Sequence, residues 1–321
     1  MLVWLTAGTA GAQAGGPSIA AAGDAHVVVA TANGGLFHSV RAAGGNWTGM
    51  GNVKGQTGDP GYVTDISDAA ILDELHVLAV TRTGGLFHAI RHGDGSWTPI
   101  GDVKAQTGNP GYVVDAIAAN VSGSLHILTR TNNGRLFHAI RFPAGNWSAM
   151  TDVKALTGDP GYVTDVGAVG GNGAFHIFAA TANGGLFQST RQPDGSWTPI
   201  SDAKSQAGNP GYVRRVSAAR IFGDVHVLVS TNDGGLFHAI RFPPGFWTAF
   251  GDVKAQTGNP GVVTDVSAAG VNGDLQILLS TRAGGLFHAI RRSAAGDWTG
   301  IGDVKAQTGN PGFVAKVGIS G

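Results

Sequence analysis

The segment GGLFHAIRHGDGSWTPIGDVKAQTGNPGYV, residues 84–113, decides the fold because it recurs along the whole chain. The dipeptide Leu-Phe returns every 50 residues, and a Trp and a Pro follow it in each copy. The six dipeptides begin at Leu36, Leu86, Leu136, Leu186, Leu236 and Leu286. Self-similarity at a fixed period of about 20–50 residues is the signature of solenoids and propellers. We therefore predict one structural unit repeated six times.

Each unit predicts four short strands joined by tight turns. Residues 263–303 contain three apolar runs and then a fourth strand with Trp298. Pairs such as Asn33-Gly34 and Asp94-Gly95 at the turns favour β-hairpins. Four strands in three hairpins are typical of a β-propeller blade. A glycine pair interrupts five of the six units and a single Gly134 the third, which excludes a helical solenoid. The fold class is therefore all-β.

The chain is predicted to be a single propeller domain over residues 1–321. Residues 4–17 match the end of a repeat, so we interpret the apolar N-terminus as a repeat end; it also lacks the basic region of a signal peptide. Two ring arrangements stay open: six blades with overlapping terminal pieces, or a seven-bladed type that has lost part of one blade. The repeats span approximately residues 18–62, 63–112, 113–162, 163–212, 213–262 and 263–313, with partial units at 1–17 and 314–321.

Composition limits the classes of partner. The formal net charge is zero, so the chain has no basic excess to attract nucleic acid or an anionic membrane surface. It has no Cys, which excludes disulfides and thiolate metal sites. No apolar run approaches the roughly 18 residues of a transmembrane helix. We expect no nucleic-acid partner, no membrane insertion and no cofactor, and the compartment stays open between secreted and cytoplasmic.

The first candidate for a binding site is the Trp of the fourth strand together with the hydroxyl residue that follows it. An aromatic face can stack on the apolar face of a sugar while a nearby hydroxyl group supplies a hydrogen bond. The alternative is a Trp that only packs the outer strand. The residues are Trp47, Trp97, Trp147, Trp197, Trp247 and Trp298, with Thr48, Thr98, Thr198, Thr248 and Thr299, and Ser148 in the third copy.

The second candidate is a tyrosine in the loop between successive units. The only four tyrosines of the chain occupy this one position, and a binding site there would lie between blades. The alternative is a hydrophobic plug after the turn. The residues are Tyr62, Tyr112, Tyr162 and Tyr212.

The third candidate is a row of histidines on the third strand, with a second row on the strand before it. We consider three roles: a buried hydrogen-bonded histidine, a sugar contact and a metal ligand. Both rows tolerate Gln and no carboxylate follows at ligand spacing, so the metal is least favoured. The third-strand residues are His38, His88, His138, His238 and His288, with Gln188 in the fourth copy; the second row is His26, His76, His126, His176 and His226, with Gln276 in the sixth.

An arginine ends the third strand in every copy, and an aspartate follows in all copies but the first. A structural Arg–Asp pair is the simplest interpretation, and donation to sugar hydroxyls is the alternative. The residues are Arg41, Arg91, Arg141, Arg191, Arg241 and Arg291, and Asp102, Asp152, Asp202, Asp252 and Asp303.

The repetition of every polar group argues against catalysis. An active site needs one unsymmetrical constellation of nucleophile, base and orienting group, and Glu74 is the only glutamate. Several equal sites on one rigid ring indicate multivalent binding, in which weak affinities combine into avidity. The alternatives are a protein-interaction scaffold and a hydrolase or lyase with a site in the central channel.

The repeat pattern GGLFHAIR…GSWTPIGDVKAQTGNPGYV resembles the Photorhabdus-type bacterial lectins, seven-bladed propellers that bind fucose and related sugars; tectonin-like propellers form the wider group. The resemblance extends over essentially the whole chain. It implies sugar sites between adjacent blades with aromatic stacking, fucosylated or related glycans, including methylated ones, as partners, and a homo-oligomer. The incomplete seventh unit departs from this family and leaves the number of blades open.

Overall fold

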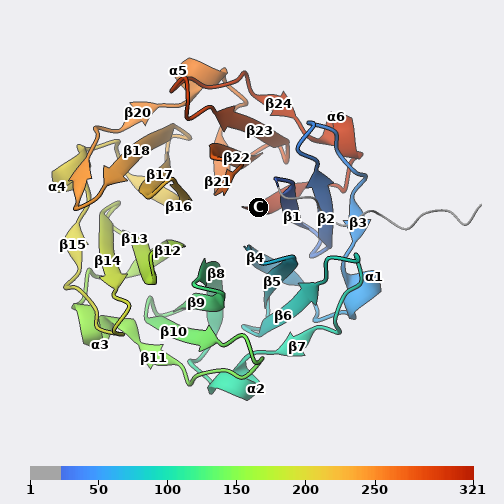
Figure 1. Ribbon diagram of the computed structural model, residues 1–321, viewed down its shortest axis with the longest axis horizontal. Coiled ribbons are helices and arrows are strands. Elements are labelled where there is room, and N and C mark those ends of the chain that lie inside the picture. Colours follow the sequence, from blue (N-terminus) through green and yellow to red (C-terminus); the bar gives the residue numbers. More distant parts are fainter. Residues whose placement is uncertain (1–22) are drawn as a thin grey trace, which may run out of the picture.

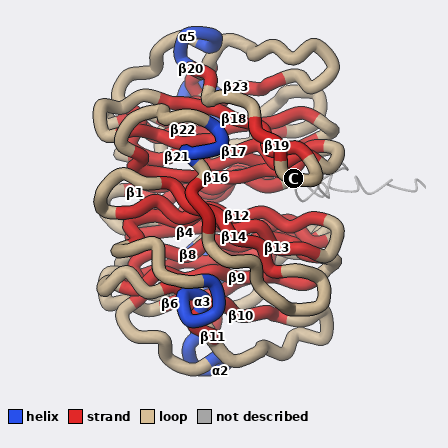
Figure 2. The backbone as a smooth tube through the Cα atoms, turned by 90° about the vertical axis from the view of Figure 1, so that its left-hand side faces the viewer, coloured by secondary structure: helices blue, strands red, loops and turns tan. Residues whose placement is uncertain are grey.

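Six antiparallel sheets are arranged around a central axis in the computed structural model, which describes residues 23–321 (Figure 1). Each sheet is one blade, and its strands are ordered from the axis outward to the rim. The side view shows the short helices at the periphery of the ring (Figure 2). The ring therefore has six blades.

Every blade follows the same order of strands from the axis outward. Blade 1 contains β25 (Val314–Ser320), β1 (Ala25–Thr31), β2 (Leu36–Arg41) and β3 (Gly51–Asn52); blade 2 contains β4 (Val63–Ile71), β5 (Glu74–Thr81), β6 (Leu86–Arg91) and β7 (Gly101–Asp102); blade 3 contains β8 (Val113–Val121), β9 (Ser124–Thr131), β10 (Leu136–Arg141) and β11 (Thr151–Asp152). Blade 4 contains β12 (Val163–Gly171), β13 (Ala174–Thr181), β14 (Leu186–Arg191) and β15 (Ser201–Asp202); blade 5 contains β16 (Val213–Ile221), β17 (Asp224–Thr231), β18 (Leu236–Phe242), β19 (Phe246–Trp247) and β20 (Gly251–Asp252); blade 6 contains β21 (Val263–Val271), β22 (Asp274–Thr281), β23 (Leu286–Arg291) and β24 (Gly302–Asp303).

A one-turn helix follows the outer strand of every blade. These helices are α1 (Lys54–Thr57), α2 (Lys104–Thr107), α3 (Val153–Thr157), α4 (Lys204–Ala207), α5 (Lys254–Thr257) and α6 (Lys305–Thr308). Gly-Asp-Pro-Gly or Gly-Asn-Pro-Gly then ends the helix and leads the chain to the next inner strand. Within residues 23–321 no helix is long and apolar enough to cross a bilayer.

The ring closes when the last strand of the chain joins the first blade. Strand β25 pairs with β1 in an antiparallel register that sets Ser320 opposite His26 and Val317 opposite Val29. The C-terminal partial unit is therefore the inner strand of blade 1. This is the six-bladed arrangement that the sequence left open, and the seven blades implied by the resemblance are not formed. The partial unit predicted at residues 1–17 lies outside the described residues.

The blades pack face to face, and the repeated Leu of the Leu-Phe dipeptide is part of this packing. All six of these leucines have no exposed surface. One apolar cluster joins Val27 and Val29 of blade 1 to Val271 of blade 6, and equivalent clusters fill the other interfaces. Burying a Leu side chain contributes about 1.5–3 kcal/mol. Stability therefore depends on contacts between blades.

Charged side chains meet at the axis, on the third residue of each inner strand. Each Asp of this set that bonds across an interface accepts a backbone N–H of the next blade, as Asp65 does from Ala116 at 3.1 Å. Lys316 of blade 1 lies 2.5 Å from Asp65 and 3.7 Å from Asp265. The cavity between these groups holds only about 30 Å³, too small for a substrate. The six residues are Lys316, Asp65, Asp115, Asp165, Arg215 and Asp265, in ring order.

Replacing Lys316 by Met is expected to lower the free energy of unfolding by about 3–5 kcal/mol, because removing one partner leaves buried carboxylates uncompensated. Burial already raises the pKa of Asp65. An acid with a raised folded-state pKa is favoured at low pH, so the loss should be smaller at pH 5 than at pH 8. Urea unfolding at both values measures this.

The control is Arg292→Met, which removes the exposed pair between Arg292 and Asp297. This pair is screened by solvent, so the free energy of unfolding should barely change. Equal losses in the two variants would show that the axial charges do not stabilise the ring.

Candidate functional site

A pocket of about 400 Å³ lies between blades 1 and 2. His38 of β2, Thr48 and Gln56 of α1 line it from blade 1. Arg91, which ends β6, and Trp97 line it from blade 2. The pocket thus combines an aromatic wall with a guanidinium group, an amide and a hydroxyl group. This is the composition of a site for a small polar ligand.

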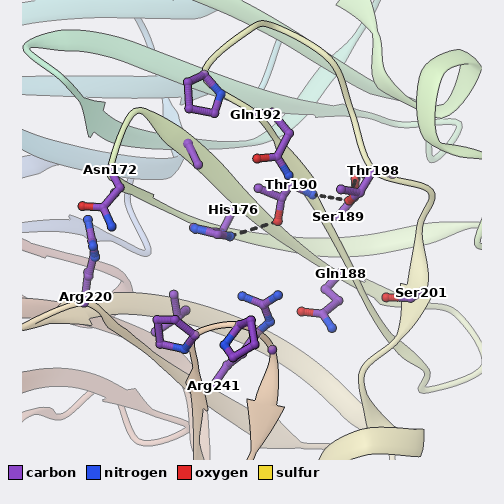
Figure 3. Close-up of a pocket in the computed structure, with 18 of the residues that line it drawn as sticks. Asn172, His176, Gln188, Ser189, Thr190, Gln192, Thr198, Ser201, Arg220 and Arg241 are labelled. Carbon is purple, nitrogen blue, oxygen red and sulfur yellow. Dashed lines mark hydrogen bonds between the residues drawn. The ribbon is translucent and has the colours of Figure 1, made fainter.

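The same positions line a pocket of about 630 Å³ between blades 4 and 5 (Figure 3). There Gln188, Thr198 and Gln206 of blade 4 occupy the places of His38, Thr48 and Gln56, and Arg241 of blade 5 takes the place of Arg91; these are equivalent positions of the repeat. The pocket therefore occurs at two interfaces, and the two copies differ, because Trp97 lines the first pocket whereas Trp247 is not among the residues that line the second.

The Trp of each blade packs edge-on against the third-strand histidine of the preceding blade. At five interfaces the ring centroids are 5.5–5.7 Å apart and the ring planes are 80–84° apart. Such edge-to-face contacts add about 0.5–1.5 kcal/mol to the burial of the rings. At the interface of blades 4 and 5, Trp247 packs instead against Phe178 at 6.2 Å. The pairs are His38–Trp97, His88–Trp147, His138–Trp197, His238–Trp298 and His288–Trp47.

The predicted combination of Trp with the hydroxyl residue after it is divided between two pockets. Trp97 faces blade 1, whereas Thr98 accepts the backbone N–H of Ile90 at 2.9 Å within its own blade. Successive side chains of an extended chain point to opposite sides, so the two cannot share a pocket. The structure brings Trp97 together with Thr48 of the preceding blade. Every copy of the hydroxyl residue makes the same bond to the third strand.

The two rows of histidines form buried pairs behind the pockets. His26 Nδ1 lies 3.0 Å from His38 Nε2, and blades 2, 3 and 5 repeat this contact. In blade 6, Gln276 takes the place of the first histidine. Burial lowers the pKa of His26 to about 4, and the positive charge of Arg91 acts in the same direction. These histidines are therefore neutral at pH 7. Among residues 23–321 no group of three or more His, Cys, Asp or Glu is arranged to hold a metal ion.

The expected Arg–Asp pair is wrong. In residues 23–321 no ion pair joins the arginines that end the third strands to the repeated aspartates. Asp102 instead accepts the backbone N–H of Lys104 at 2.8 Å at the start of α2. Arg91 faces the pocket, and burial lowers its pKa. The guanidinium group therefore lines the pocket, and its donation to sugar hydroxyls stays a prediction.

Sequence reasoning also missed a glutamine of the one-turn helix. Gln56 and Gln206 line the two pockets. Recurrence at one position of the repeat was the available signal, because Gln106, Gln256 and Gln307 occupy the same place. In blade 3 the residue is Leu156, which is about half exposed.

The four tyrosines lie away from the Trp pockets, at the other end of the blades. The ring of Tyr62 packs against Gly34 in the β1–β2 turn, and its hydroxyl donates to the carbonyl of Ala32. Gly34 has φ +81°, and a Cβ there would lie 2.6 Å from the ring. Tyr112, Tyr162 and Tyr212 make the same bond to the preceding blade. This arrangement is the plug that the sequence left as an alternative.

The fold is similar to those of several solved lectins. The fucose-specific lectin from Aleuria aurantia matches with a TM-score of 0.65 and 16% identity, over 87% of this chain and 90% of that chain. The BP39L lectin from Burkholderia pseudomallei matches with a TM-score of 0.60 and 19% identity, over 88% and 81%. AofleA from Arthrobotrys oligospora matches with a TM-score of 0.59 and 15% identity, over 90% and 88%. The sequence matches no protein-family model and no curated protein.

Acid is expected to destabilise the ring. Ten histidines have a lowered pKa in the folded ring. In the unfolded chain these histidines are protonated below about pH 6.5, whereas in the folded ring they stay neutral down to about pH 4. Their contribution is complete above pH 6.5 and declines as the pH falls. Three buried aspartates have raised pKa values, so acid favours the folded state through them, but they are fewer than the ten histidines. Urea midpoints measured from pH 7.5 to 4.5 should decrease steadily.

The variant His26→Gln reproduces the Gln276–His288 pair that blade 6 already has, and it should make the pH dependence shallower. Midpoints that rise toward acid pH would contradict neutral buried histidines.

Proposed function

We propose that this protein is a multivalent lectin, and not an enzyme, whose interblade pockets bind terminal fucose or a related, including methylated, sugar. The observation that supports this most directly is the presence of one kind of pocket at two interfaces, built from positions that recur along the repeat. A sugar has polar hydroxyl groups and an apolar face, and the pocket offers a partner for each. Six weak sites on a rigid ring would combine into avidity for a surface with many glycans.

The pocket between blades 1 and 2 suggests a role for each residue. Arg91 presents a fork of donors suited to two adjacent ring hydroxyls. Thr48 and Gln56 supply further polar contacts, and Trp97 offers its indole surface. Val40 lines the same pocket, and an apolar side chain suits the methyl group of a 6-deoxy sugar. Fucose combines these features.

The solved relatives support fucose as the ligand to test first. The Aleuria aurantia lectin has been solved with α-methyl-L-fucoside and with Fucα1-6GlcNAc, and SapL1 lectin with α-methyl fucoside. The homo-oligomer that the family resemblance implies belongs to the same proposal, because it would multiply the number of sites.

Calorimetric titration with methyl α-L-fucoside tests the proposal. We expect several equivalents of fucoside per chain and no more than six, because the ring has six interfaces. No heat from the fucoside and no binding to fucosylated or methylated glycans on an array would refute it. A protein partner that free sugar does not displace would instead support a scaffold.

The variant Arg91→Ala removes the guanidinium fork from one pocket only. A hydrogen bond to a charged group contributes about 1.5–3 kcal/mol, so affinity at that pocket should fall roughly tenfold or more and the stoichiometry by one. The matched control is Arg135→Ala, which removes an exposed arginine paired with Asp152 outside the pockets. An unchanged stoichiometry for Arg91→Ala would show that this arginine does not bind the ligand.

A further inference from the structure

We propose that the pocket between blades 4 and 5 binds a sugar that has a carboxylate group, in contrast to the neutral sugar expected elsewhere on the ring. The inference deepens the proposed lectin function and rests on it. It comes from three local departures from the repeat that meet at this one interface.

The first departure is a missing carboxylate. In blades 1, 2, 5 and 6 an acidic residue stands just before or at the start of the second strand, and Asp24 lines the pocket between blades 1 and 2. Blade 4 has Ala174 at this position, and Ala174 lines the pocket. No aspartate or glutamate is among the residues that line the pocket between blades 4 and 5. The equivalent acidic residues are Asp24, Glu74, Asp224 and Asp274.

The second departure is an added cation. Arg220, near the end of β16, lines this pocket and forms no ion pair within residues 23–321. The other blades have small or neutral residues at its position: Ala70, Asn120, Gly170, Gly270 and Gly321. The pocket thus gains one positive charge and lacks the negative charge found in four other blades.

The third departure makes room for that cation. Blade 4 has Gly171 where blades 2, 3, 5 and 6 have a valine or isoleucine. A Cβ on Gly171 would lie 2.2 Å from an Nη1 atom of Arg220. A β-branched side chain would therefore displace the guanidinium group. Gly171 and Arg220 belong to different blades, so the two changes are complementary across the interface.

Arg241 is the second cation of the pocket. Figure 3 shows Arg241 on the blade 5 side below His176 of blade 4, and Arg220 beside Asn172 at one end of the same pocket. The Nε atom of Arg241 and the Nε1 atom of Trp247 are buried and have no hydrogen-bond partner in the described residues. A carboxylate matches a guanidinium fork in shape and charge.

One position of the wall is polar here, where Val40 lines the pocket between blades 1 and 2. Thr190 replaces the Val or Ile of the other third strands, and its hydroxyl group lies 2.9 Å from His176 Nδ1. Burial, Arg241 and Arg220 together lower the pKa of His176 to about 4, so this histidine is neutral. In a hexuronic acid the carboxylate replaces the terminal carbon group that is a methyl in fucose. A polar, cationic pocket of about 630 Å³ suits that exchange.

A glycan array with matched acidic and neutral probes tests this inference. The probes are glycans ending in glucuronate, galacturonate or sialate, beside glycans ending in glucose, galactose or fucose. The wild-type protein should bind at least one carboxylated class, and Arg220→Ala should weaken that binding about tenfold or more. The charge-matched control is Arg214→Ala, because Arg214 is exposed at the opposite end of the same strand. Binding of the neutral glycans serves as the internal reference for both variants.

Ala174→Asp introduces the carboxylate that four other blades have, and it should also abolish binding of the carboxylated glycans. Raising the salt concentration should weaken the binding of acidic probes more than the binding of neutral ones. If neutral glycans bind and no carboxylated probe does, or if Arg220→Ala and Arg214→Ala behave alike, this inference is wrong while the lectin proposal survives. If no glycan binds, both fail.

Discussion

The contact between each blade and the preceding one is the interaction on which this ring depends. A four-stranded sheet of this size has no core of its own, and its apolar faces are buried only between neighbours. The edge-to-face contact of Trp97 with His38 belongs to that interface and also forms a wall of the pocket. Core and candidate binding site are therefore one surface. The ligand would meet groups whose positions are already fixed by folding, which reduces the ordering cost of binding.

The sequence predicted the blade and its four strands because the repeat, the turn pairs and the apolar runs are local signals. It did not decide how the ring closes, since β25 and β1 pair across nearly the whole length of the chain. It also assigned Trp97 and Thr98 to one site, because adjacency along the chain says nothing about which neighbouring blade a side chain faces. The aspartate was assigned to an arginine, whereas Asp102 caps a helix that begins two residues later. The first two errors share one cause: ring closure and the candidate pockets involve contacts between units, and a repeat pattern describes units.

Differences among the copies are more informative about specificity than the features they share. Ala174, Gly171 and Arg220 are each visible as exceptions in the sequence, and they are separated by up to 49 positions. Only the fold shows that they meet at one interface. Leu156, in place of the glutamine found in the other five helices, is another such exception, and it sets blade 3 apart from its neighbours. A ring of similar pockets can thus diverge one interface at a time while its packing is retained.

The charged groups at the axis constrain how the number of repeats in this architecture can change. Near-identical tandem repeats invite unequal recombination, which adds or deletes whole units. The outer interfaces would tolerate such an event, because most of them present the same Trp and His to one another. The axis would not, because Lys316 and Arg215 occur once each and balance particular aspartates. Deleting the unit that contains Arg215 would leave Asp165 buried without its cation. Loss or gain of a unit would therefore disturb the charge balance at the axis even where the packing between blades could be restored.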